Sequence, residues 1–161
     1  MSDIEIRFEE APEQAYKLLK KIMKKYFTDM ANANILILMD TKIRTADSGN
    51  KIILGRFVKT NDLTRHLTID ESGTDRGFDY IMFLDKVMWD NIDDADRERI
   101  IRHELRHALV ADKFQVQGHS IEDFYEEVEL NQDDPRWRER VALVTQTKYD
   151  ALKNPQQKLP L

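Results

Sequence analysis

Two histidines and a glutamate form the most distinctive chemical pattern of the chain, the segment HELRH at residues 103–107. Residues four positions apart lie one above the other on a helix, so His103 and His107 can bind the same metal ion through their imidazoles. Glu104 lies one step round the helix, where it can accept a proton from a water molecule that the metal activates. The spacing therefore predicts a catalytic metal site with Glu104 as its general base.

A third protein ligand is needed, because a catalytic zinc ion takes three side chains and leaves its fourth position to water. His119 follows twelve residues after His107, and a reversal of the chain between them would bring its imidazole back to the pair. We expect His119 to be this ligand and the site to hold one Zn²⁺ per chain, since an all-imidazole set favours zinc. The alternative third ligands are carboxylates of the next segment, namely Asp123, Glu126 and Glu127. The acidic run at residues 126–134 is otherwise expected to be a solvated face.

The composition excludes several kinds of protein. No cysteine occurs among the 161 residues, which excludes disulfides, thiolate catalysis and cysteine-bound zinc or iron–sulfur sites. Hydrophobic residues make up 41% and charged residues 34%, as in a folded globular chain rather than a disordered one. The net charge of −5 at pH 7 gives no indication of nucleic-acid binding. We therefore expect a folded protein without a nucleic-acid partner.

Length and hydropathy limit how many domains and membrane-spanning segments the chain can contain. The length favours a single domain, which we place at residues 1–150, with residues 151–161 expected to be a flexible tail. The longest apolar run, residues 35–39, is too short to cross a bilayer. The first residues lack the basic region and apolar stretch of a secretory signal. These features predict a cytoplasmic protein that does not bind a membrane.

Helical periodicity identifies the elements that would hold the site. Apolar residues recur at helical spacing over residues 12–30 and alternate with lysines, which predicts an amphipathic helix with its lysines in solvent. The histidine pair falls in a predicted helix that begins at a cap from Asp93 or Asp94 and ends near Ala111. Two more helices are expected after it, at residues 121–130 and 133–149.

Three segments have the composition of β-strands, at residues 35–39, 52–59 and 78–85. A turn cluster around Ser48 and Gly49 separates the first two, which predicts that they pair as a hairpin. The third is apolar on both faces and is expected to be covered on both. His66 falls in a polar loop and is expected at the surface. The pattern predicts an α/β (α+β) fold: an N-terminal helix packed on a small, mostly antiparallel sheet of three to four strands, then the histidine-bearing helix and C-terminal helices.

Residues 102–108 resemble the active-site helix of the HExxH zinc peptidases known as zincins. Within that class, the layout of residues 13–130 resembles the family called putative phage metallopeptidases and its SprT-like relatives. SprT-like proteins carry a third histidine in a short HG segment followed by an aromatic residue, which corresponds here to His119 and Phe124. Ser120 stands where those relatives have glycine. The segments that carry the resemblance are residues 51–56, 78–85 with Trp89, 99–108 and 118–124.

The resemblance implies a zincin-like fold and hydrolysis of polypeptides, with Zn²⁺ on His103, His107 and His119 and with Glu104 as general base. It also implies that residues 78–84 form the edge strand on which a substrate peptide pairs. A phage-encoded chain would act in the cytoplasm of its bacterial host. The sequence leaves two alternatives open: a phage-type protein-binding module that keeps the fold without hydrolysis, and, more weakly, a zinc-dependent hydrolase of cell-wall amides.

Overall fold

A computed structural model describes residues 6–43, 54–108 and 125–153 of the chain. The strands of these ranges form one four-stranded sheet in the order β1-β2-β4-β3. β2 and β4 are parallel, whereas the pairs β1–β2 and β3–β4 are antiparallel. The predicted α+β fold with a small, mostly antiparallel sheet is therefore confirmed. The strands are β1 (Phe8–Glu10), β2 (Ile35–Asp40), β3 (Gly55–Lys59) and β4 (Tyr80–Asp85).

The order of the strands corrects two expectations. The predicted hairpin of residues 35–39 with 52–59 is wrong, because β4 lies between β2 and β3. Residues 78–84 are not an edge strand either, since β4 pairs on both sides. The physical reason lies in their composition: a strand that is apolar on both faces belongs in the middle of a sheet. β1 and β3 are the edge strands instead, and Arg56 and Lys59 of β3 are exposed.

A helix lies at each predicted place, but two of them end elsewhere than predicted. The histidine-bearing helix ends at Arg106 and not near Ala111, and the last helix runs to Lys153, into the first three residues of the predicted tail. The short helices between residues 61 and 90 were not predicted. Residues 61–76, expected to form a loop, contain α2 and α3, and the predicted surface position of His66 in α2 is confirmed. The lysines of α1 are exposed, as predicted. No helix of the described ranges is long and apolar enough to cross a membrane. The helices are α1 (Glu13–Tyr26), η1 (Thr28–Met30), α2 (Asp62–Leu67), α3 (Ile69–Ser72), α4 (Lys86–Asp90), α5 (Asp94–Arg106), α6 (Tyr125–Leu130) and α7 (Trp137–Lys153). Residues 154–161 of the predicted tail lie outside the described part of the chain.

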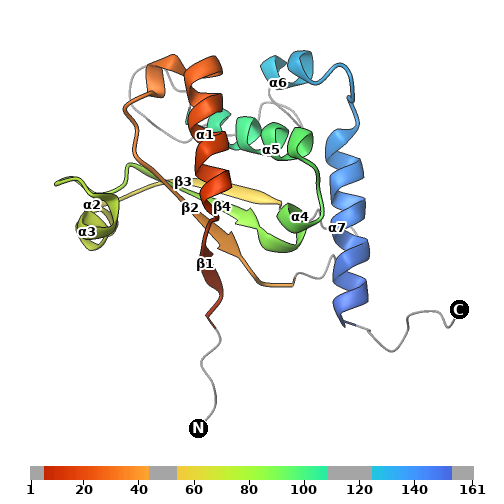
Figure 1. Ribbon diagram of the computed structural model, residues 1–161, viewed down its shortest axis with the longest axis horizontal. Coiled ribbons are helices and arrows are strands. Elements are labelled where there is room, and N and C mark those ends of the chain that lie inside the picture. The colour runs from red at the N-terminus through yellow and green to blue at the C-terminus, as the bar shows by residue number, and fades with distance from the viewer. Residues whose placement is uncertain (1–5, 44–53, 109–124, 154–161) are drawn as a thin grey trace, which may run out of the picture.

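One face of the sheet packs against α1 and α5, which lie beside each other in Figure 1. Alternate residues of β2 and β4 point to this face, and their side chains form the core together with apolar residues of the two helices. Gly55 and Phe57 of β3 belong to the same face, because they pair with Leu84 and Met82 of β4. The sheet residues of the core are Ile35, Ile37, Met39, Phe57, Tyr80, Met82 and Leu84.

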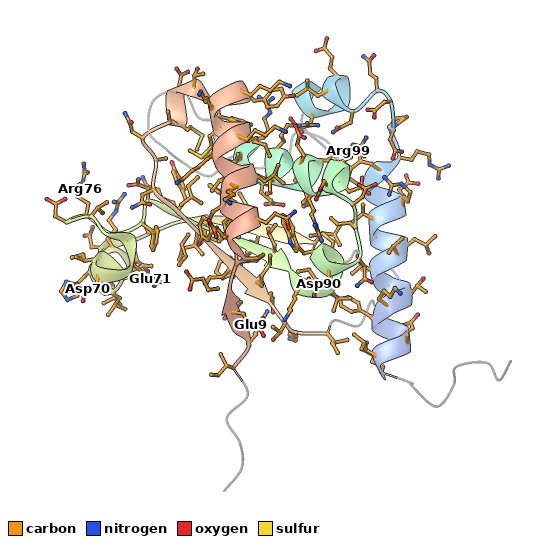
Figure 2. All side chains as sticks on the ribbon, in the orientation of Figure 1. Glu9, Asp70, Glu71, Arg76, Asp90 and Arg99 are labelled. Atoms are coloured by element: carbon orange, nitrogen blue, oxygen red, sulfur yellow. The ribbon has the colours of Figure 1, made fainter. Side chains whose placement is uncertain are left out.

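The N-terminal end of α5 is anchored to α7 through a buried carboxylate. Asp93 is the cap that the sequence predicted as one of two, and its side chain accepts a hydrogen bond from the backbone N–H of Asp96. Asp96 is 1% exposed and accepts hydrogen bonds from Arg99 at 2.7 Å and Arg140 at 2.6 Å. Burial alone would raise the pKa of Asp96, but the hydrogen bonds from Arg140 and Arg99 outweigh it and lower that pKa. Arg99 lies on the part of α5 that faces α7 (Figure 2).

Candidate metal centre

α5 carries His103 and His107 on one face at its C-terminal end. His103 lies in the last turn, and His107 is the C-cap residue with helical backbone angles of −60° and −28°. The four-residue spacing therefore places the two imidazoles on consecutive turns of one face, as the sequence predicted. Their ring centroids lie 5.6 Å apart with the ring planes at 82°. His103 is buried and His107 is half-buried.

The Glu104 carboxylate lies beside the histidine pair. Its Oε2 atom is 3.9 Å from Nε2 of His107, and its side chain is buried. Ligand atoms of His103, Glu104 and His107 all lie within 4.8 Å of one another. Zinc accepts two imidazoles as ligands, and a carboxylate beside them can hold a metal-bound water molecule; the three side chains converge in a largely buried part of the molecule. The side chains present therefore fit a single divalent ion.

Gly55, the first residue of β3, leaves the space that the Glu104 side chain occupies. A β-carbon at position 55 would lie 2.9 Å from Oε1 of Glu104 and 3.1 Å from its Cδ. These distances are shorter than ordinary van der Waals contact, so any side chain here would push the carboxylate away. Gly55 therefore helps to set the position of the predicted general base. Sequence reasoning placed it in a strand without giving it this role.

Two arginines alternate with the histidines along α5, and a single carboxylate pairs with both. Arg102 donates from Nε to Oε1 of Glu127 at 3.1 Å, and Arg106 donates from Nε to Oε2 at 3.0 Å. Glu127 lies in α6, and its side chain is 0% exposed. The expectation that Glu127 belongs to a solvated face is therefore wrong. The reason is that Arg102 is buried and Arg106 is half-buried, and charges removed from solvent require an opposite charge.

The predicted third ligands have different outcomes. Both oxygens of Glu127 accept hydrogen bonds from arginines, and Glu127 does not join the close group of His103, Glu104 and His107. His119 and Asp123 lie outside the described residues, as does the side chain of Glu126. The choice of His119 therefore stays a prediction.

The α+β fold places a histidine pair on a helix that packs against a small sheet, with a carboxylate beside the pair. This is the arrangement of a candidate metal-dependent hydrolase. Residues 6–151 match the model of the family described as "Putative phage metallopeptidase". The chain belongs to this family, which confirms the predicted resemblance to the putative phage metallopeptidases. No curated protein and no solved structure gives a significant match. Membership of the family implies a bound metal and a polypeptide substrate.

Proposed function

We propose that the protein is a zinc-dependent peptidase in which Glu104 acts as general base. The observation that carries this proposal is the close group on α5, in which ligand atoms of two histidines and a buried glutamate lie within 4.8 Å of one another. Membership of a metallopeptidase family supports it independently. The cysteine-free composition suits the reducing cytoplasm that the proposal assigns to the protein.

The chemistry divides among the residues of the centre. Zinc, when bound, lowers the pKa of a water molecule towards neutrality and polarises a substrate carbonyl. His103 and His107 hold the ion in this proposal, and His119 completes the set, with Glu126 and Asp123 as the alternatives. Glu104 accepts the proton that the attacking water loses and then delivers it to the leaving amine. Its burial beside the pair keeps the carboxylate within reach of both events.

The edge of the sheet supplies a place for the substrate. β3 pairs with β4 on one side, and no other strand of the described residues covers its second side. Backbone N–H and C=O groups at such an edge can pair with an extended peptide. Gly55 lies at the start of β3 and adjoins Glu104, so a peptide paired with β3 runs past the general base. β3 thus takes the role that the resemblance assigned to residues 78–84.

The proposal predicts metal-dependent cleavage of unstructured polypeptides. The purified protein, loaded with zinc, is incubated with a mixture of peptides of varied sequence, and the products are identified by mass spectrometry. We expect internal cleavage that a chelator abolishes and that added zinc restores, because water activation depends on the ion. Zinc-loaded protein that cleaves none of the peptides would favour the alternative of a protein-binding module.

A further inference from the structure

We propose that Glu127 is a positioning residue of the metal centre, acting through Arg102 and Arg106 to fix the turns of α5 that carry the two histidines. The inference rests on the proposed function, because it requires that the histidine pair binds a metal. It assigns a role to a residue that touches neither the ion nor a substrate.

The pattern along α5 carries the first step. Arg102 directly precedes His103, and Arg106 directly precedes His107, so the arginines repeat at the same four-residue spacing as the ligands. One carboxylate bridges the two arginines, with Oε1 on Arg102 and Oε2 on Arg106. Two charged hydrogen bonds from consecutive turns to one rigid group fix both the rotation of the helix and the rise between those turns.

Contacts on the other sides of the arginines complete the arrangement. Arg102 also donates to Asn131 Oδ1 at 2.6 Å, just after α6, and to Glu98 at 3.2 Å. The Arg102 guanidinium lies 5.3 Å from the ring centroid of Tyr26, and that of Arg106 lies 4.6 Å from the ring centroid of Phe27. The arginines are therefore held between the end of α1 and α6, two segments distant in the sequence.

The position of these contacts explains why the metal would depend on them. The described helix ends at Arg106, and His107 is its C-cap, where backbone hydrogen bonds are fewest and a helix frays most readily. Zinc requires ligand distances near 2.0–2.1 Å, so a frayed last turn would place His107 poorly. The Arg106–Glu127 pair joins this turn to α6 immediately before His107. Groups that orient metal ligands in this way typically change metal affinity by about 10- to 100-fold.

Glu127→Gln tests the inference through zinc affinity, measured by competition with a chromophoric chelator. We expect affinity to fall about 10- to 100-fold, because glutamine cannot accept charged hydrogen bonds from both arginines. Asp96→Asn is the matched control. It also removes a buried carboxylate that two arginines hold, Arg99 of α5 and Arg140 of α7, but Asp96 lies about two turns before His103. Both variants should unfold at lower urea concentration, and only Glu127→Gln should lose zinc affinity.

Unchanged zinc affinity in folded Glu127→Gln, or an equal loss in Asp96→Asn, would overturn the inference. If Glu127→Gln does not fold, Arg106→Lys provides the test, because lysine keeps the positive charge but lacks the Nε donor. We expect Arg106→Lys to bind zinc several-fold more weakly than the wild type. Unchanged zinc affinity in this variant would overturn the proposal. Wild-type protein that binds no zinc would contradict the proposed function as well. Wild-type binding together with unaltered affinity in the variants would contradict only the role of Glu127.

Discussion

Replacing Glu104 with glutamine lowers the rate of peptide hydrolysis by about 10²- to 10⁴-fold, the usual contribution of a general base, and leaves the zinc content unchanged. Glutamine has nearly the same shape as glutamate, but its amide cannot take up the proton of the attacking water. The carboxylate is not needed to hold the ion, because the proposal assigns that task to the histidines. The measurements are the turnover number on a cleaved peptide and the zinc content per chain.

The matched control is Glu139→Gln on α7. Glu139 is exposed and pairs with Arg136, so the same chemical change there should leave turnover and zinc content as in the wild type. Retained turnover in Glu104→Gln would remove Glu104 from the mechanism. Loss of zinc along with activity would instead make the carboxylate part of the metal-binding set.

Gly55→Ala should lower turnover by about 10²-fold, a loss that follows from moving a catalytic group by roughly 1 Å. The new β-carbon would lie 2.9 Å from Oε1 of Glu104, and the carboxylate must swing away to relieve the contact. Because the obstructing atoms belong to the end of a flexible side chain, the fold should tolerate the change. The measurements are turnover, zinc content and the urea midpoint of unfolding.

Gly73→Ala provides the opposite pattern. Gly73 has a φ of 70°, and an added β-carbon would meet nothing within 4 Å. The left-handed backbone makes alanine cost about 1–2 kcal/mol of folding free energy, while Glu104 stays where it is. We expect lower stability with full turnover in Gly73→Ala, against near-normal stability with low turnover in Gly55→Ala. Equal turnover in the two variants would show that the space at Gly55 does not position the base.

The sequence was sufficient to predict the helix that carries the histidines, because its signals are local. A capping aspartate predicts the start of α5, and the spacing of His103 and His107 predicts that both lie on one face of it. The order of the strands had no such signal. β2 and β4 lie about forty residues apart in the chain and pair in parallel, while the turn cluster at Ser48 and Gly49 favoured a local hairpin. Non-local pairing depends on how whole elements pack, which short patterns do not encode.

The two supporting residues of the site were missed for different reasons. Glu127 stands in an acidic run, and only the packing of α6 against α5 shows that it is buried. A signal existed, since arginines at 102 and 106 flank the ligands on a buried helix and need an opposite charge. Gly55 is one of only five glycines in the chain, and a glycine inside a strand indicates that another group approaches closely. The sequence could not show that this group is Glu104.

The zinc content of the purified, tag-free protein, determined by elemental mass spectrometry for the wild type and for His103→Ala, tests most directly whether the histidine pair forms a metal centre. We predict one zinc per chain in the wild type and a large loss in His103→Ala, since removing one imidazole leaves the ion with an incomplete set of ligands. Wild-type protein without zinc, even after incubation with zinc and dialysis, would contradict both the metal centre and the peptidase mechanism built on it.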